Sequence, residues 1–147
     1  MRVLVQRVRQ ASVKIDGQIH GQIGPGLLLL VGFRSGDTER ELRFCAQKCA
    51  HLRIFADDQG KMNHSVLDTG GAVLAVSQFT LYGECRKGRR PSFDQAAQPH
   101  DAEILYERFL CILTEEGLPP ASGVFGAEML VESHNDGPIT LIVESPT

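Results

Sequence analysis

The segment Ala72–Phe79 (AVLAVSQF) is an apolar run of strand length that ends abruptly in hydroxyl and amide side chains. Its β-branched residues favour a buried strand, and Leu27–Phe33 (LLLLVGF) is a second apolar run of strand length. Two shorter runs, Val3–Val8 and Ser12–Ile15, alternate with a period of two and predict two further strands. With another short strand over Gln18–Ile23, the first third of the chain is predicted to be a β-meander.

Two amphipathic helices follow from apolar residues spaced three or four apart. The first is predicted from about Thr38 to His51, with its apolar face formed by Leu42, Cys45, Ala46, Cys49 and Leu52. The second opens at Pro99 and ends at Gly117. Two more strands, about Ala127–Ser133 and Ile139–Glu144, are joined by an Asn-Asp-Gly-Pro turn. We therefore predict an α+β fold with a mostly antiparallel sheet flanked by two main helices.

Length and composition limit the class of protein. The chain has 147 residues and 42% hydrophobic residues, which predicts one domain, residues 1–147, with a core that needs no metal or disulfide. The N-terminal segment has no secretory pattern, so we expect a cytoplasmic protein with reduced cysteines and no membrane partner. A net charge of −3 argues against non-specific coating of DNA or RNA. Any RNA contact is expected to be local.

One run of cations offers such a contact. Arg86, Lys87, Arg89 and Arg90 lie within five residues around Gly88. The residues by themselves favour a solvated loop, and contact with RNA phosphates is the alternative.

Several common chemistries have no sequence support. The chain contains no Gly-x-Ser-x-Gly pentapeptide, no Walker-type phosphate loop and no Gly-x-Gly-x-x-Gly fingerprint. The spacing of Cys45, Cys49 and His51 is suggestive of zinc, but no second pair of ligands follows, and both cysteines share the apolar helix face. We interpret them as small buried residues and expect no metal and no cofactor.

Two short stretches remain as candidates for function. Along Ser77–Leu81, an extended backbone would point Ser77 and Phe79 one way and Gln78 and Thr80 the other. Where a strand stops pairing, its free N–H groups can form an oxyanion hole for an ester carbonyl. An ordinary buried strand end is the alternative. Gly137-Pro138 is a good hairpin turn in itself, with a trans peptide bond as the default.

Both stretches, Ser77–Leu81 (SQFTL) and Asn135–Thr140 (NDGPIT), resemble the paired signature of the D-aminoacyl-tRNA deacylases. The resemblance extends in order over essentially the whole chain. It includes Met1–Val8 with Ala11–Val13, Arg53–Phe55 leading to Gly60–Asn63, and Arg90–Phe93. The one departure that we note is Ile139, where Val is commoner. The resemblance implies a small β-barrel-like core and a homodimeric enzyme that acts on the 3′ acceptor end of aminoacyl-tRNA.

The resemblance also assigns roles to individual residues. It implies that Ser77, Gln78, Phe79 and Thr80 line the catalytic pocket, with the amides of Phe79 and Thr80 as oxyanion donors. It implies that Phe125 packs against the terminal adenine, that Arg7 braces the Gly-Pro loop and that Met129 walls the pocket. It also makes phosphates of the acceptor end the favoured partner of the run 86–90.

Chiral selection is implied to come from Gly137 and Pro138. In the family this bond is cis, and the pair from one subunit reaches into the pocket of the other. A rigid carbonyl there accepts the substrate ammonium and leaves no room for an L side chain, so D-aminoacyl esters and mischarged glycine are the expected substrates.

Three alternatives stay open. Thr80 could be a nucleophile, although no base is evident, and the family is understood to use the RNA's own 2′-hydroxyl to help activate water. A related deacylase with a trans Gly-Pro bond would accept some L-aminoacyl esters. A non-catalytic RNA-binding module would use Arg86–Arg90 and release no amino acid.

Overall fold

Strand β1 (Arg2–Ile15) organises the sheet in the computed structural model, which describes all residues from 1 to 147. Strand β8 (Leu130–Glu144) pairs antiparallel with β1 along nearly its full length. The opposite edge of β1 is shared, because β3 (Gly26–Gly32) pairs with residues 2–8 and β2 (Gln18–Ile23) pairs with residues 11–15. The predictions of two separate strands and of a β-meander are therefore wrong. The chain continues as one strand from 8 to 11 because β8 pairs with it on the other edge, with register irregularities on either side of Val8.

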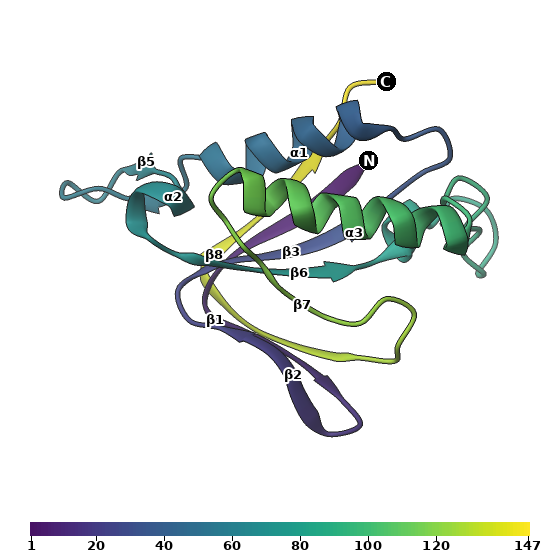
Figure 1. Ribbon diagram of the computed structural model, residues 1–147, viewed down its shortest axis with the longest axis horizontal. Helices are drawn as coiled ribbons and strands as arrows, with labels where there is room; N and C mark the ends of the chain where they lie inside the picture. The colour runs from purple at the N-terminus through teal and green to yellow at the C-terminus, as the bar shows by residue number, and fades with distance from the viewer.

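Parallel pairing completes the sheet. Strand β6 (Ala72–Ser77) lies parallel to β3, and the short β7 (Ala121–Ser122) lies parallel to β6. The result is a mixed, nearly closed, barrel-like sheet that curves around its own interior (Figure 1). A separate small hairpin is formed by β4 (Phe55–Ala56) and β5 (Met62–His64). The predicted α+β, barrel-like class is confirmed.

Two long helices cover one face of the sheet side by side (Figure 1). Helix α1 (Glu39–His51) begins at a capping box, in which the Thr38 N–H donates to Glu41 Oε2 at 2.7 Å. Helix α3 (Pro99–Glu115) starts at a proline and is followed by Gly117 with a φ of 89°. Both predicted helices are thus confirmed, and a short α2 (Val66–Thr69) is added before β6.

The main core lies between this helix layer and the sheet. It contains the β3 side chains of Leu27 and Leu29 and the α3 side chains of Tyr106 and Phe109, all fully buried. Cys45 and Cys49 of α1 are also buried, as predicted, and burial raises the pKa of both thiols, that of Cys45 to about 12. None of the helices is long and apolar enough to cross a membrane.

The predicted hairpin at Asn-Asp-Gly-Pro is not a hairpin. Strand β8 continues through it, still paired to β1 on both sides. Gln6 faces Thr140 and Val8 faces Asn135, so β1 advances by two residues while β8 advances by five. Residues 136–139, which lie opposite Arg7 alone, leave the ladder as a bulge, which we call the Gly-Pro bulge. The turn residues were correctly recognised, but the chain leaves and rejoins the same partner strand.

Candidate active site

A cavity of about 520 Å³ opens where β6 ends. The start of α3 and the loop that leads into β8 form its other walls. Figure 1 shows these three segments converging at one end of the molecule. Predicted site residues that line it are Ser77, Gln78, Phe79, Phe125 and Met129. Thr80, Arg7, Gly137 and Pro138 are not part of its lining.

This β6 cavity has an unusual lining, because none of its fifteen residues carries an ionisable side chain. Ten are hydrophobic, and the polar side chains are those of Ser77, Gln78 and Gln98. None of the five histidines lines it. A reaction in this cavity therefore depends on backbone dipoles, hydroxyl and amide groups, and groups brought by the substrate.

The backbone at the end of β6 supplies free donors. The Gln78 N–H donates to Val31 O at 2.7 Å, the last sheet bond of this strand. The chain then turns into a 3₁₀ helix, η1 (Phe79–Tyr82). The N–H groups of Phe79 and Thr80 have no backbone acceptor, because the first residues of a helix lack one.

The predicted alternation of side chains along Ser77–Leu81 is therefore wrong beyond Ser77. The neighbouring strand β3 ends at Gly32, so no partner remains to hold the chain extended. In a strand, the N–H groups of Phe79 and Thr80 would point in opposite directions. The tighter turn of η1 brings them together.

Aromatic packing fixes the walls of the cavity. The rings of Phe79 and Phe93 meet edge to face, with centroids 5.1 Å apart. On the inner side, Tyr106 lies against Phe125 with ring centroids 6.1 Å apart. Its hydroxyl donates to Ala75 O of β6 at 2.8 Å, and burial raises the pKa of Tyr106 to about 12. Tyr106 thus remains a neutral donor that ties α3 to the strand below the site.

Thr80 has no partner that could act as a base. It is exposed, and its hydroxyl accepts a hydrogen bond from the Gln78 side-chain amide. No histidine or carboxylate is bonded to it. An activated hydroxyl nucleophile needs such a neighbour, so the geometry argues against a covalent role for Thr80.

The Gly-Pro bulge lies in a separate, open hollow of about 350 Å³ that it forms with Arg9 and His134. Gly137 has a φ of 116°, and the Gly137-Pro138 bond is cis. A Cβ on Gly137 would lie 2.9 Å from Ile139 Cγ1 and 3.0 Å from an Arg7 guanidinium nitrogen. Both the backbone conformation and the available space therefore require glycine here.

The Asn135 side chain holds together the two ends of the bulge, where β8 leaves and rejoins the ladder; we call this point the neck of the bulge. Asn135 donates through Nδ2 to the carbonyls of Arg7, at 3.0 Å, and Ile139, at 2.9 Å. Its Oδ1 accepts from the Thr140 hydroxyl at 3.1 Å. One amide thereby replaces the ladder bonds that the bulge interrupts.

Two arginines brace the bulge from β1. Arg7 Nε lies 3.4 Å from Asp136 Oδ2, and Arg9 Nε lies 3.3 Å from Asp136 Oδ1. Arg7 also donates to Ile54 O at 2.6 Å, which anchors its side chain to the segment before β4. The structure thus brings Arg7 to the bulge and not to the β6 cavity.

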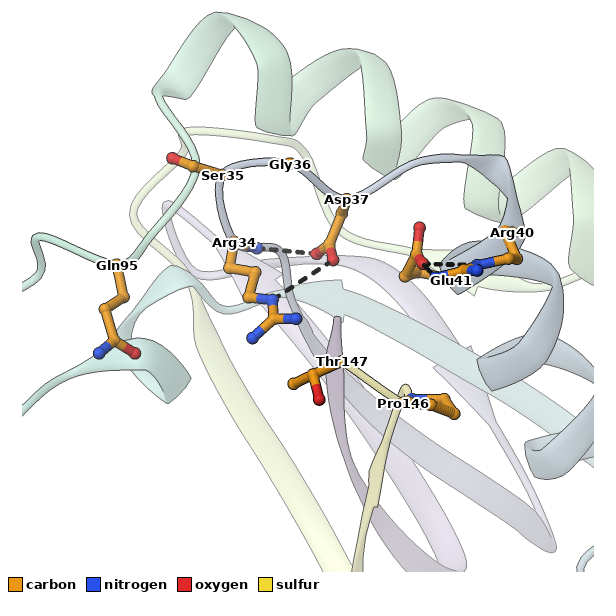
Figure 2. Close-up of a pocket in the computed structure, with 9 residues that line it drawn as sticks. All are labelled: Arg34, Ser35, Gly36, Asp37, Arg40, Glu41, Gln95, Pro146 and Thr147. Atoms are coloured by element: carbon orange, nitrogen blue, oxygen red, sulfur yellow. Dashed lines mark hydrogen bonds and ion pairs between the residues drawn. The ribbon is translucent and has the colours of Figure 1, made fainter.

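A further hollow, of about 410 Å³, lies between the start of α1 and the C-terminal residues (Figure 2). It has no hydrophobic lining residue. Its charged side chains are already paired, Arg40 with Glu41 at 3.0 Å and Arg34 with Asp37 at 3.9 Å. Asp37 also binds the Met1 ammonium at 2.8 Å. This hollow offers a substrate no hydrophobic side chain, and the β6 cavity is the better candidate.

The site also contains residues that the sequence did not single out. Phe93 lies in the stretch Arg90–Phe93 that carried the resemblance, so its role could have been found there. Asn135 likewise belongs to the second signature. Tyr106 has the helical spacing of any core residue, and nothing in the sequence distinguishes it.

Comparison with known proteins confirms the family resemblance over nearly the whole chain. A family model described as D-Tyr-tRNA(Tyr) deacylase matches residues 4–144. The chain belongs to the D-aminoacyl-tRNA deacylase family. Family membership makes it a hydrolase of the aminoacyl-tRNA ester class, so the prediction of an enzyme is confirmed.

Relatives of this deacylase family match end to end. The D-aminoacyl-tRNA deacylases of Shouchella clausii and Brevibacillus brevis are each 61% identical over 145 residues. This alignment covers 99% of the chain in both cases, and 99% and 100% of the two relatives. A solved structure titled c-Myc DNA Unwinding Element Binding Protein superposes with a TM-score of 0.94 at 41% identity, with 100% of both chains covered. A second, titled as a probable eukaryotic D-amino acid tRNA deacylase, has a TM-score of 0.85 at 20% identity and shares the fold.

Proposed function

We propose that this single domain hydrolyses the ester between a D-amino acid, or glycine on a non-cognate tRNA, and the terminal adenosine of tRNA. The observation that carries the proposal is the β6 cavity, which has no ionisable lining residue but two unpaired amides at its edge. Such a site suits an ester, whose carbonyl develops negative charge, and a substrate that brings its own hydroxyl.

The two amides act as the oxyanion hole. As water attacks the ester carbonyl, the N–H groups of Phe79 and Thr80 donate to the developing oxyanion, each contributing about 3 kcal/mol to the transition state. The 2′-hydroxyl of the terminal ribose helps to activate the water. Ser77 and Gln78 supply the polar contacts of the wall, and no covalent intermediate forms.

The apolar half of the cavity holds the nucleoside. Phe125 stacks on the terminal adenine, because a base on an aromatic ring gains about 1–3 kcal/mol without need of ionisable groups. Met129 closes the adjacent wall. The Phe79–Phe93 pair borders the cavity. Phe79 is 53% exposed, so its ring is accessible to a ligand.

Chiral rejection comes from a second subunit in a homodimer. The Gly-Pro bulge does not line the cavity of its own chain, so it must serve that of a partner if it meets the substrate. Strand β8, which carries the bulge, has one unpaired edge and exposes Leu130 at 61% and Ile142 at 63%. Apolar side chains on a free strand edge favour association with a second copy.

The rigidity of the bulge determines the selectivity. Asn135 fixes its backbone and the Arg7–Asp136 pair adds weak support, so a carbonyl placed beside the substrate α-carbon cannot retreat. It accepts the ammonium group and collides with any L side chain, whereas D-residues and glycine fit. Selection by backbone is indifferent to the D side chain, so a broad substrate range follows.

Deacylation of matched D- and L-tyrosyl-tRNA tests the activity. We expect rapid release of D-tyrosine and no release of L-tyrosine above the uncatalysed rate. Equal cleavage of both would contradict chiral selection. Tight, strongly salt-dependent binding of tRNA with no release of D-tyrosine would favour the non-catalytic RNA-binding module.

Mixing two defective variants tests the cross-subunit site. Phe125→Ala damages the cavity and Gly137→Ala damages the bulge, so each homodimer is expected to be impaired. After the subunits are exchanged, half of the dimers pair one of each and contain one intact composite site, which restores about a quarter of the wild-type sites. No recovery, with subunit exchange verified by mass, would contradict a bulge that acts in trans.

Thr80→Val tests the covalent alternative. If Thr80 acts only through its backbone amide, kcat should fall less than about tenfold, because that amide remains in the variant. Complete loss of turnover with substrate binding preserved would make Thr80 the nucleophile.

A further inference from the structure

The basic run identified in the sequence forms a defined loop. Residues 85–91 are all exposed, and the loop projects beyond the N-terminal end of α3 (Figure 1). Its two ends are clamped by an antiparallel bridge, in which Glu84 N donates to Ser92 O at 2.7 Å and Ser92 N donates to Glu84 O at 3.0 Å. The base of this loop is therefore fixed, while its cations face solvent.

The cations of the loop are not equivalent. Arg86 is paired with Glu84, which accepts from its backbone N–H and its guanidinium and whose pKa is thereby lowered to about 2. Lys87, Arg89 and Arg90 have no carboxylate within ion-pair distance and no hydrogen bond to the protein. Nine of the fifteen Lys and Arg side chains are ion-paired, so these three make up half of the unpaired six.

The position of this loop relates it to the β6 cavity. Ser92, at its closing bridge, is followed directly by Phe93, which lines the cavity and packs on Phe79. A nucleic acid that has its 3′ end in the cavity and leaves past this rim runs toward the loop. The phosphates that precede the terminal adenosine are thus brought to the side of the molecule from which the loop projects.

We propose that Lys87, Arg89 and Arg90 form a phosphate-binding site for the acceptor stem of the tRNA, and that Arg86 is not part of it. The inference deepens the proposed function and rests on it. A protein of net charge −3 repels a polyanion as a whole, so attraction must come from a local group of unpaired cations. Contacts to phosphates are independent of base sequence, so this site raises the affinity for any tRNA and leaves the chemical step unchanged.

The test compares a full substrate with one that lacks the stem. The triple variant Lys87→Gln/Arg89→Gln/Arg90→Gln removes the three charges of the loop. Lys48→Gln/Arg53→Gln/Lys61→Gln removes the other three unpaired cations, which are also exposed, as a matched control. Both are assayed on D-tyrosyl-tRNA and on the D-tyrosyl ester of adenosine. The affinity for uncharged tRNA is measured between 50 and 200 mM salt.

We expect the loop variant to lose affinity for tRNA and to keep its rate on D-tyrosyl-adenosine. Three lost phosphate contacts predict that wild-type affinity falls about 20- to 40-fold more than that of the variant over this salt range. The control and Arg86→Gln should both follow wild type. An unchanged salt dependence in the loop variant, an equal loss in the control, or an equal loss on both substrates would overturn the phosphate site. If wild type cleaved neither substrate, the proposed function itself would fail.

Discussion

The β6 cavity and the Gly-Pro bulge are held in shape by different forces. The cavity has no ionisable lining residue and is fixed by ring packing and by the buried hydroxyl of Tyr106. The bulge is polar and partly exposed, and it is fixed by the Asn135 amide and by Arg7 and Arg9 on Asp136.

The difference follows from where each lies relative to the sheet. The cavity forms at a strand end that the helix layer covers, so apolar burial can order it. The bulge interrupts a ladder near the surface, where side-chain hydrogen bonds must replace the lost backbone bonds. The two regions are therefore expected to respond differently to mutation, salt and pH.

Gly137→Ala should have the largest effect of the changes considered. A Cβ at a φ of 116° and 2.9 Å from Ile139 would distort the bulge backbone. Displacement of a positioning group by about 1 Å costs on the order of 100-fold in rate, so kcat/KM for D-tyrosyl-tRNA should fall by about that factor. Gly60→Ala is the control, since Gly60 has a φ of 77° but open space around it. A similar loss in the control would show that backbone strain alone is responsible.

Asn135→Ala should loosen the neck of the bulge without filling it. Two carbonyls lose their donor, which corresponds to about 1–2 kcal/mol of stability. We expect the ratio of D- to L-tyrosyl-tRNA cleavage to fall about tenfold. Thr140→Val, which removes only one of the three hydrogen bonds of Asn135, should have a smaller effect. Unchanged selectivity in Asn135→Ala would separate the bulge from chiral rejection.

Tyr106→Phe tests whether a neutral hydrogen bond stabilises the cavity. At pH 8 the variant should be less stable by about 1 kcal/mol, because Ala75 O loses its donor. The pKa of Tyr106 is raised to about 12 from 10, so its contribution is complete below pH 10 and is lost as pH rises toward 12. The difference in urea midpoint between wild type and variant should therefore shrink between pH 10 and pH 12.

Tyr82→Phe gives the control for that experiment. The pKa of Tyr82 is also raised to about 12 by burial, but its hydroxyl has no hydrogen-bond partner. Removal of the Tyr82 hydroxyl should change the free energy of unfolding little at pH 8. Between pH 10 and pH 12 this variant, like Tyr106→Phe, should lose less stability than wild type. A large loss at pH 8 would indicate an unseen partner for this hydroxyl.

Asp136→Asn should have the smallest effect. It removes partly exposed ion pairs to Arg7 and Arg9, which are worth at most about 1 kcal/mol and are screened by salt. We expect about a twofold loss of D- to L-selectivity at 20 mM salt that disappears at 500 mM. A large, salt-independent loss would mean that Asp136 shapes the bulge directly.

Short-range sequence patterns predicted the helices and the buried strands. The helix from Thr38 to His51 and the one from Pro99 were found because capping and apolar spacing act within a few residues. The buried strands Leu27–Phe33 and Ala72–Phe79 were found within two residues of their observed ends. The resemblance over the whole chain gave the family, because its two signatures lie in order in the sequence.

The tertiary structure alone decided how these elements meet. That β1 continues from 8 to 11, and that Asn135–Thr140 forms a bulge instead of a hairpin, depends on pairing between residues more than 100 positions apart. The 3₁₀ turn at Phe79 depends on β3 ending at Gly32, which the sequence around Phe79 does not encode. Strand pairing is set by distant partners that compete for the same backbone groups, whereas caps, turns and helical faces are set by near neighbours.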